Sequence, residues 1–249
     1  MSNEDIIKLV GTIVLSVIVL AFIVVSIILN KKKKPETEEE VVEGEETKKH
    51  QFIDVKFMTR TAIFAAISAI LYVVPYLQFK LPFFPGFLEV HLDEVPLLIA
   101  GFAYGPLSGI FALLIKTLIK LPLTSTMCVG ELADFIYSLF FIVPSAIFYK
   151  YHRNFKGALI ALAIGTVCQI TAASFITTFL ILDFYMFVMH FPKEAIMGMI
   201  HSAGINIDSL SWPFLYAVGL PFNAFKDALV LILTILLYKK LHTIVEKAI

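Results

Sequence analysis

The amino-acid sequence predicts an all-α integral membrane protein in which one extra N-terminal transmembrane helix precedes a bundle of six helices. Two observations predict this fold class. Of the 249 residues, 59% are hydrophobic and the mean hydropathy is +0.86, which is typical of membrane proteins and not of soluble domains. The apolar residues also form uncharged runs long enough for membrane helices, which need roughly 20 residues each.

The first apolar run predicts a membrane anchor over residues 1–30. Leu9 to Leu29 contains no charge and is long enough for one span. Acidic residues precede this run and Lys31–Lys34 follow it, so the N-terminus is expected outside the cell and the lysines inside. A cleavable signal peptide would have a basic start and a shorter apolar core.

Residues 31–55 are expected to form a charged, disordered cytoplasmic linker. Its central part, Pro35 to Thr47, contains seven glutamates and almost nothing to bury. An acidic docking segment for a basic partner is the less favoured alternative. The six-helix domain is then expected over residues 56–249.

The first helix of this domain is expected over Thr61 to Leu77 and contains small residues spaced four apart. These are Ala62 with Ala66, and Ala65 with Ala69. Small residues at this spacing allow two helix backbones to approach closely. Two interpretations remain open: packing within this chain, which the spacing alone favours, and a contact face for another protein.

Gly105-Pro106 divides the long apolar run from Val95 to Ile115, which we interpret as two helices, Asp93–Tyr104 and Pro106–Lys120. Two passes place fourteen of the twenty Lys and Arg residues on the cytoplasmic side, whereas one kinked pass would place both later basic clusters outside. The first helix, at ~18 Å, is too short for ~30 Å of hydrocarbon. It must therefore pack against neighbours or border a cavity, and short helices of this kind often mark a substrate site.

Three further helices are expected over Glu131–Tyr149, Gly157–Leu182 and Val218–Tyr238, with the C-terminus in the cytoplasm. The segment from Asp183 to Ala217 is long and rich in methionine and aromatic residues. Long loops in compact domains are usually functional or disordered, and this one is too apolar for disorder. We expect an outer lid with helical turns, and a segment that rests on the membrane interface is nearly as well supported.

Composition and motifs exclude several classes of function. The net charge of zero argues against nucleic-acid binding. The chain has no phosphate-binding loop of the G-x-x-x-x-G-K-[ST] type and no H-E-x-x-H motif, so we do not expect it to hydrolyse nucleotides by itself. Cys128 and Cys168 are not expected to form a disulfide, and the scattered histidines predict no metal site and no cofactor.

Lys226 is the clearest functional candidate because a charge within a membrane span is costly. Asn223 precedes it by three residues, so both side chains project from one face of the last helix. An amide and an ammonium group on one face can bind a polar ring with carbonyl and imide groups. A structural ion pair of Lys226 with Asp227, Glu131 or Asp134 is the equally weighted alternative.

The remaining membrane-embedded charges have simpler expected roles. Glu131 and Asp134 share the beginning of one helix, where capping is favoured over ligand binding, and the same holds for Asp93 and Glu94. We retain Glu131 and Asp134 as candidate substrate-binding residues. Lys116 and Lys120 are one turn apart and are expected to extend toward the membrane surface.

A family resemblance is found in three segments: LEVHLDEVPLLIAGFAYGPLSGI, LIKTLIKLPLTSTMCVGELADF and LPFNAFKDAL. They resemble the substrate-binding S component of energy-coupling factor (ECF) vitamin transporters, and within that family the riboflavin-specific branch. The resemblance covers about Lys56 to His242. It implies a cell-membrane protein that captures a vitamin from outside and then topples to deliver it inward, together with a transmembrane coupling protein and two ATPase subunits. The four alanines of the first helix would contact the coupling protein.

The resemblance also implies a set of substrate-binding residues. In the riboflavin branch an Asn-x-x-Lys pair binds the flavin ring, and Asn223 and Lys226 match it. Leu88 matches a leucine whose neighbourhood supplies a backbone contact. Thr177 stands where the family has an asparagine, and Asp183 where it has a proline. The implied function is uptake of riboflavin or a related flavin.

Other functions compete with flavin uptake. An S component for a different vitamin, such as folate or pantothenate, would share the fold and most motifs. A membrane enzyme with an outward-facing cavity is a second alternative, but no paired base and nucleophile occurs at a recognisable spacing. A structural membrane scaffold is a third, and it leaves Lys226 and the short helices unexplained.

Overall fold

The computed structural model describes residues 55–124 and 126–247. The chain divides into two units, Met1–Arg60 and Thr61–Ile249, and only residues 55–60 of the first unit are described. The N-terminal helix expected over residues 1–30 and residues 31–54 of the linker expected over 31–55 lie outside the described residues; Val55 begins helix α2 (Val55–Val73).

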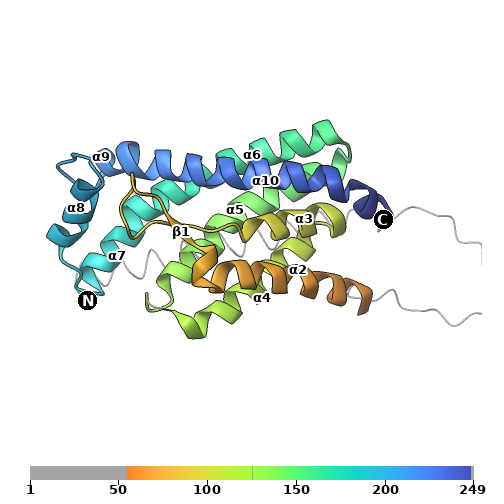
Figure 1. The fold of residues 1–249 in the computed structure, drawn as a ribbon, viewed down its shortest axis with the longest axis horizontal. Helices are drawn as coiled ribbons and strands as arrows, with labels where there is room; N and C mark the ends of the chain where they lie inside the picture. The colour runs from red at the N-terminus through yellow and green to blue at the C-terminus, as the bar shows by residue number, and fades with distance from the viewer. Residues whose placement is uncertain (1–54, 125, 248–249) are drawn as a thin grey trace, which may run out of the picture. The chain divides into compact units, whose positions relative to one another are not determined.

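The described residues form a series of helices, with a longer loop between α2 and α3 (Figure 1). The longer helices are α2 (Val55–Val73), α3 (Glu94–Tyr104), α4 (Pro106–Lys120), α5 (Val129–Tyr151), α6 (Phe155–Ile176) and α10 (Leu220–Lys247). The shorter ones are α7 (Leu182–Phe187), α8 (Lys193–Ser202) and α9 (Trp212–Phe214), with 3₁₀ turns at Pro75–Leu77 and Leu121–Leu123.

Among the described residues, five helical stretches are long and apolar enough to cross a membrane, so the expected class of helical multi-pass membrane protein is confirmed. They are Val55–Val73, Pro106–Leu123, Val129–Tyr151, Phe155–Phe187 and Trp212–Tyr238. Two of them include a π-helical segment, η3 (Thr177–Ile181) between α6 and α7 and η4 (Leu215–Gly219) between α9 and α10. The short helix α3 is apolar but does not reach spanning length.

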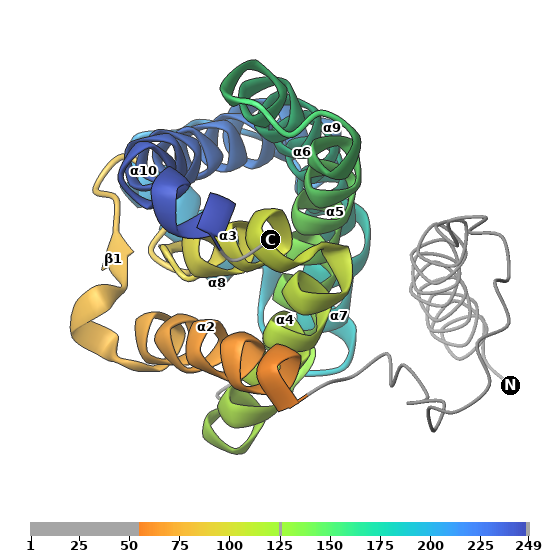
Figure 2. The ribbon, with the colours of Figure 1, turned by 90° about the vertical axis from the view of Figure 1, so that its right-hand side faces the viewer.

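The predicted break at Gly105-Pro106 is confirmed. Gly105 has a φ of 93°, which is a left-handed conformation that favours glycine, and Pro106 occupies the first turn of α4. Of the eleven residues of α3, all except Tyr104 are buried. Figure 2 looks along the helices and shows α3 enclosed by α4, α5 and α10, which all contact it. Other helices therefore surround this short helix, as its length required.

The loop between α2 and α3 contains a small β-sheet that the sequence analysis did not predict. Strand β1 (Phe79–Lys80) pairs antiparallel with β2 (Glu89–Val90), with Phe79 opposite Val90. Lys80 lies opposite Glu89 and forms an ion pair of 3.2 Å with it. The His91 ring, 3.6 Å from the Glu89 carboxylate, and the Lys80 ammonium lower the pKa of Glu89 to about 2.

Two glycines allow neighbouring helices to pack closely. A Cβ at Gly165 of α6 would lie 2.0 Å from Ser145 Oγ of α5, and a Cβ at Gly109 of α4 would lie 2.6 Å from the Ile142 side chain of α5. A Cβ atom does not come this close to a neighbouring side chain in real proteins. Both glycines are therefore required for the present helix spacing. These close contacts make α5 the helix against which α4 and α6 are positioned.

The segment between α7 and α9 is structured, as its apolar composition predicted. Helix α8 packs through Ile196 and Ile200 into an apolar cluster that also contains Leu182, Phe214 and Val218. Phe87 and Leu88, from the β1–β2 loop, pack against this cluster. The apolar cluster around α8 therefore supports a loop that belongs to the candidate site described next, and α8 lies at the same end of the helices as that loop (Figure 1).

Candidate functional site

A cavity of about 220 Å³ brings together all six candidate substrate-binding residues. Its wall includes Leu88, Glu131, Asp134, Thr177, Asn223 and Lys226. They come from the β1–β2 loop, from α5, from the start of η3 and from α10, which are far apart in sequence. That these residues bind the substrate stays a prediction, but their convergence on one cavity is what such a role requires.

Aromatic side chains form much of the remaining cavity wall. They are Tyr72, Phe87, Tyr137, Tyr185, Phe214 and Phe222. Tyr137 shares a hydrogen bond of 2.9 Å between its hydroxyl and Thr177 Oγ1, which orients both polar groups. An apolar cavity with a few fixed polar groups is the usual form of a small-molecule site. Aromatic walls suit a flat ring in particular.

Lys226 is buried, with 6% of its surface exposed, and its Nζ donates to Glu94 Oε1 at 3.2 Å. Lys226 thus forms an ion pair, as the structural alternative held, but the partners named for it, Asp227, Glu131 and Asp134, were wrong, because the ion pair is with Glu94. Glu94 was also wrongly interpreted as a helix cap. Its side chain is fully buried and accepts hydrogen bonds from Ser138 at 2.9 Å and Gln169 at 2.5 Å.

Lys116 is fully buried between two carboxylates and does not extend toward the membrane surface, so that expectation was wrong. Its Nζ lies 2.5 Å from Asp93 Oδ2 and 2.7 Å from Asp134 Oδ2, and 4.1 Å from the centre of the Tyr72 ring. Asp93 precedes α3 but makes no side-chain capping hydrogen bond, because its own conformation is helical (φ −69°, ψ −19°). Asp93 and Asp134 therefore neutralise a buried cation instead of capping helices.

Glu131 is in the first turn of α5, as expected, but its hydrogen bonds go elsewhere. Its Oε2 accepts from the hydroxyls of Thr124 at 2.7 Å and Thr126 at 2.9 Å, both in the loop before α5. The N-cap of α5 is Cys128, and its side chain makes no capping bond. Two threonine hydroxyls thus fix the position of the Glu131 carboxylate in the cavity wall.

Asn223 has a fixed orientation because both of its side-chain N–H groups are used. Its Nδ2 donates to the carbonyl oxygen of Gly219 at 2.9 Å and to Ser174 Oγ at 3.0 Å. Gly219 belongs to η4, and Ser174 precedes η3; π-helical segments often occur at functional sites. This leaves the Asn223 Oδ1 atom for a ligand, so Asn223 offers a hydrogen-bond acceptor to the cavity.

The four alanines of α2 are divided between two environments. Ala65 is fully buried and Ala69 is 5% exposed, so they pack within the protein. Ala62 and Ala66 are exposed. The Thr61–Val73 part of α2 is held by Ser68, whose hydroxyl donates to the Asp93 carbonyl at 2.7 Å. Only Ala62 and Ala66 are therefore available to a partner protein.

Sequence reasoning missed several residues of this site, namely Tyr72, Tyr137, Glu94, Lys116 and Gln169. One signal was present for two of them. Glu94 and Lys116 are charged residues at the ends of apolar runs, and the rule that singled out Lys226 applies to them as well. For the tyrosines and the glutamine, the sequence contains no comparable signal.

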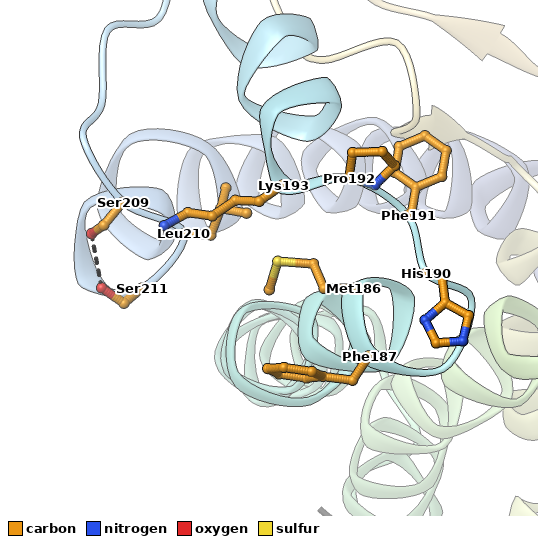
Figure 3. Close-up of a pocket in the computed structure, with 9 residues that line it drawn as sticks. All are labelled: Met186, Phe187, His190, Phe191, Pro192, Lys193, Ser209, Leu210 and Ser211. Carbon is orange, nitrogen blue, oxygen red and sulfur yellow. Dashed lines mark hydrogen bonds between the residues drawn. The ribbon is translucent and has the colours of Figure 1, made fainter.

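A second, wider pocket of about 690 Å³ lies between the end of α7 and the start of α8 (Figure 3). Met186 and Phe187 form one side, and Lys193, Leu210 and the Ser209–Ser211 hydrogen bond of 3.0 Å form the other. Of its nine lining residues only Leu210 is buried. This open pocket contains none of the six candidate residues, so the smaller cavity is the better candidate site.

Comparison with known proteins agrees with the helical membrane fold. The family described as "ECF transporter, substrate-specific component" matches residues 56–238. "Riboflavin transporter FmnP" of Bacillus subtilis (strain 168) is 29% identical over 76% of this chain and 94% of its own length. "Riboflavin transporter RibU" of Staphylococcus aureus (strain TCH60) is 28% identical over 76% of this chain and 93% of its own length.

A solved structure, "Structure and mechanism of the S component of a bacterial ECF transporter", has a TM-score of 0.57 and 26% sequence identity, over 76% of this chain and 96% of that chain. The family consists of transporter components, which answers the enzyme alternative: the chain is not an enzyme. Membership also implies an energising module as partner. The chain belongs to the substrate-specific S components of ECF transporters.

Proposed function

We propose that this S component captures riboflavin, or a closely related flavin, from outside the cell and releases it inside. The proposed energising module is a transmembrane coupling protein with two ATPase subunits. One observation carries the proposal: the Asn223 Oδ1 acceptor and the Lys226 ammonium donor, both on α10, line the same aromatic cavity. The names of the two relatives as riboflavin transporters support the same substrate.

The edge of a flavin ring fits this pair chemically. It presents an imide, in which one N–H lies between two carbonyl groups. The N–H can donate to Asn223 Oδ1, and a carbonyl oxygen can accept from the Lys226 ammonium. The Tyr and Phe side chains of the cavity provide apolar surfaces for the faces of the ring.

The described cavity is smaller than most ligand sites, which have volumes of roughly 300–1,000 Å³. At about 220 Å³ it must widen to admit a flavin. Leu88 and Phe87 line the cavity and pack against the cluster around α8. Outward movement of their loop together with α8 is therefore the proposed opening step.

Flavin binding is tested with the purified full-length protein. We expect riboflavin to bind with one-to-one stoichiometry, to be quenched in fluorescence by the aromatic wall, and to colour the preparation yellow when it copurifies. A thermal-shift panel with riboflavin, folate and pantothenate decides between vitamins. Stabilisation by folate or pantothenate with no response to riboflavin would contradict the flavin assignment and favour another S-component substrate.

The proposed orientation has the C-terminus and the α5–α6 turn in the cytoplasm. It rests on Lys150, Arg153 and Lys156, which surround that turn. In a variant without Cys128 and Cys168, a cysteine at Asn154 should be protected from an impermeant thiol reagent in intact cells. A cysteine at the exposed Asp208, between α8 and α9, should react as the matched control. Labelling at 154 with protection at 208 would reverse the orientation.

A further inference from the structure

Glu131 is a buried carboxylate in the wall of the cavity without an ion-pair partner among residues 55–124 and 126–247. Only 5% of its surface is exposed. The two threonine hydroxyls bind one of its oxygens, Oε2. Its other oxygen, Oε1, remains available to accept hydrogen bonds from a ligand. A buried carboxylate of this kind is costly unless something donates to it.

The charges around Glu131 do not compensate for it. Lys226 and Asp134, which line the cavity, are both engaged with residues behind its wall: Lys226 is paired with Glu94, and Asp134 shares Lys116 with Asp93. With Glu131, four carboxylates are thus set against two ammonium groups. When all are ionised, this buried cluster has an excess of negative charge.

Lys120 is the remaining lysine of the described cavity wall, and it is placed differently. Its Nζ lies 5.2 Å from the centre of the Tyr72 ring, and the residue is partly exposed. Solvent screens the field of a partly exposed ammonium more than that of a buried carboxylate. An anionic ligand group in the cavity would therefore be repelled by Glu131 more strongly than it is attracted by Lys120.

We propose that the cavity accepts the flavin as its uncharged polyol and excludes the phosphate ester, and that Glu131 is the residue that discriminates between them. This inference rests on the proposed function. The hydroxyl groups of a polyol side chain donate hydrogen bonds to the free Glu131 oxygen. A phosphate ester has a charge of about −1.5 to −2 at pH 7 and acceptor oxygens that cannot satisfy a carboxylate.

The test measures dissociation constants of the full-length protein for three probes: riboflavin, riboflavin 5′-phosphate and lumiflavin, which lacks the polyol. The wild type should bind riboflavin at least about tenfold more tightly than the phosphate ester. Glu131→Gln should lower this ratio by about tenfold, through weaker riboflavin and stronger phosphate binding, and should leave lumiflavin unchanged. Because the ratio is taken within each variant, a partial loss of folded protein does not alter it.

Two control variants separate Glu131 from the other charges of the wall. Glu89→Gln removes a second carboxylate that lines the cavity but is paired with Lys80, and it should change the ratio by less than about threefold. Lys120→Met should leave the preference for riboflavin in place. Loss of phosphate-ester binding in Lys120→Met, together with an unchanged ratio in Glu131→Gln, would overturn the proposal.

The affinities of the wild-type protein for the three probes already test the proposal. Equal affinity for riboflavin and its phosphate ester would overturn the role of Glu131 while leaving flavin capture intact. Failure to bind any of the three probes would instead overturn the proposed function, and this inference with it.

Discussion

Lys226→Met should weaken riboflavin binding by about ten- to a hundredfold, because it removes the only charged donor we assign to the flavin ring. Asn223→Ala should have an effect of similar size, since it removes the acceptor for the imide N–H. Fluorescence titration, followed through the protein or the flavin, measures the riboflavin dissociation constant of both variants. The expected free-energy loss is roughly 1–3 kcal/mol for each variant.

The same Lys226 substitution should also destabilise the protein. It leaves the fully buried Glu94 carboxylate without its cation, which costs about 3–5 kcal/mol for pairs of this kind. The matched double variant Lys226→Met with Glu94→Gln removes the uncompensated charge, and the amide that replaces the carboxylate still has Ser138 and Gln169 as neighbours. We expect it to regain most of the thermal stability but none of the flavin affinity. Normal flavin binding by Lys226→Met with lowered stability alone would show that Lys226 is only a structural ion-pair member.

Ala62→Leu and Ala66→Leu should lower transport by at least about tenfold while changing the riboflavin dissociation constant by less than about twofold. Both alanines are exposed on α2, where we propose that the coupling protein packs, and a partner helix there would require a small residue for close approach. Uptake into cells with the energising module, copurification with the coupling protein and flavin binding are measured side by side.

Ala65→Leu and Ala69→Leu are the matched controls on the same helix. Their side chains are buried, so the added bulk should cost ~1–3 kcal/mol of stability and lower binding and transport together. If Ala62→Leu and Ala66→Leu behaved like these controls, the exposed alanines would belong to the fold and not to the coupling contact.

Helix positions near strong local signals could be predicted from the sequence. Pro106–Lys120 was expected with the bounds that the structure shows, because glycine and proline at its start leave few other conformations. The buried, short α3 followed from its length alone, since backbone polar groups in a membrane must be satisfied by protein. The β1–β2 pair was not predicted, because strands of two residues show no periodicity.

The sequence alone determined that Asn223 and Lys226 share a face of α10, since spacing along one helix follows from its geometry. It could not determine their partners. Lys226 binds Glu94, which is 132 residues away, and Lys116 binds Asp93 and Asp134 on two other elements. Local rules assigned those carboxylates to helix caps, which stabilise by about 0.3–1 kcal/mol near a surface. A buried ammonium without a carboxylate costs several times more, so the tertiary structure places the carboxylates against the cations instead.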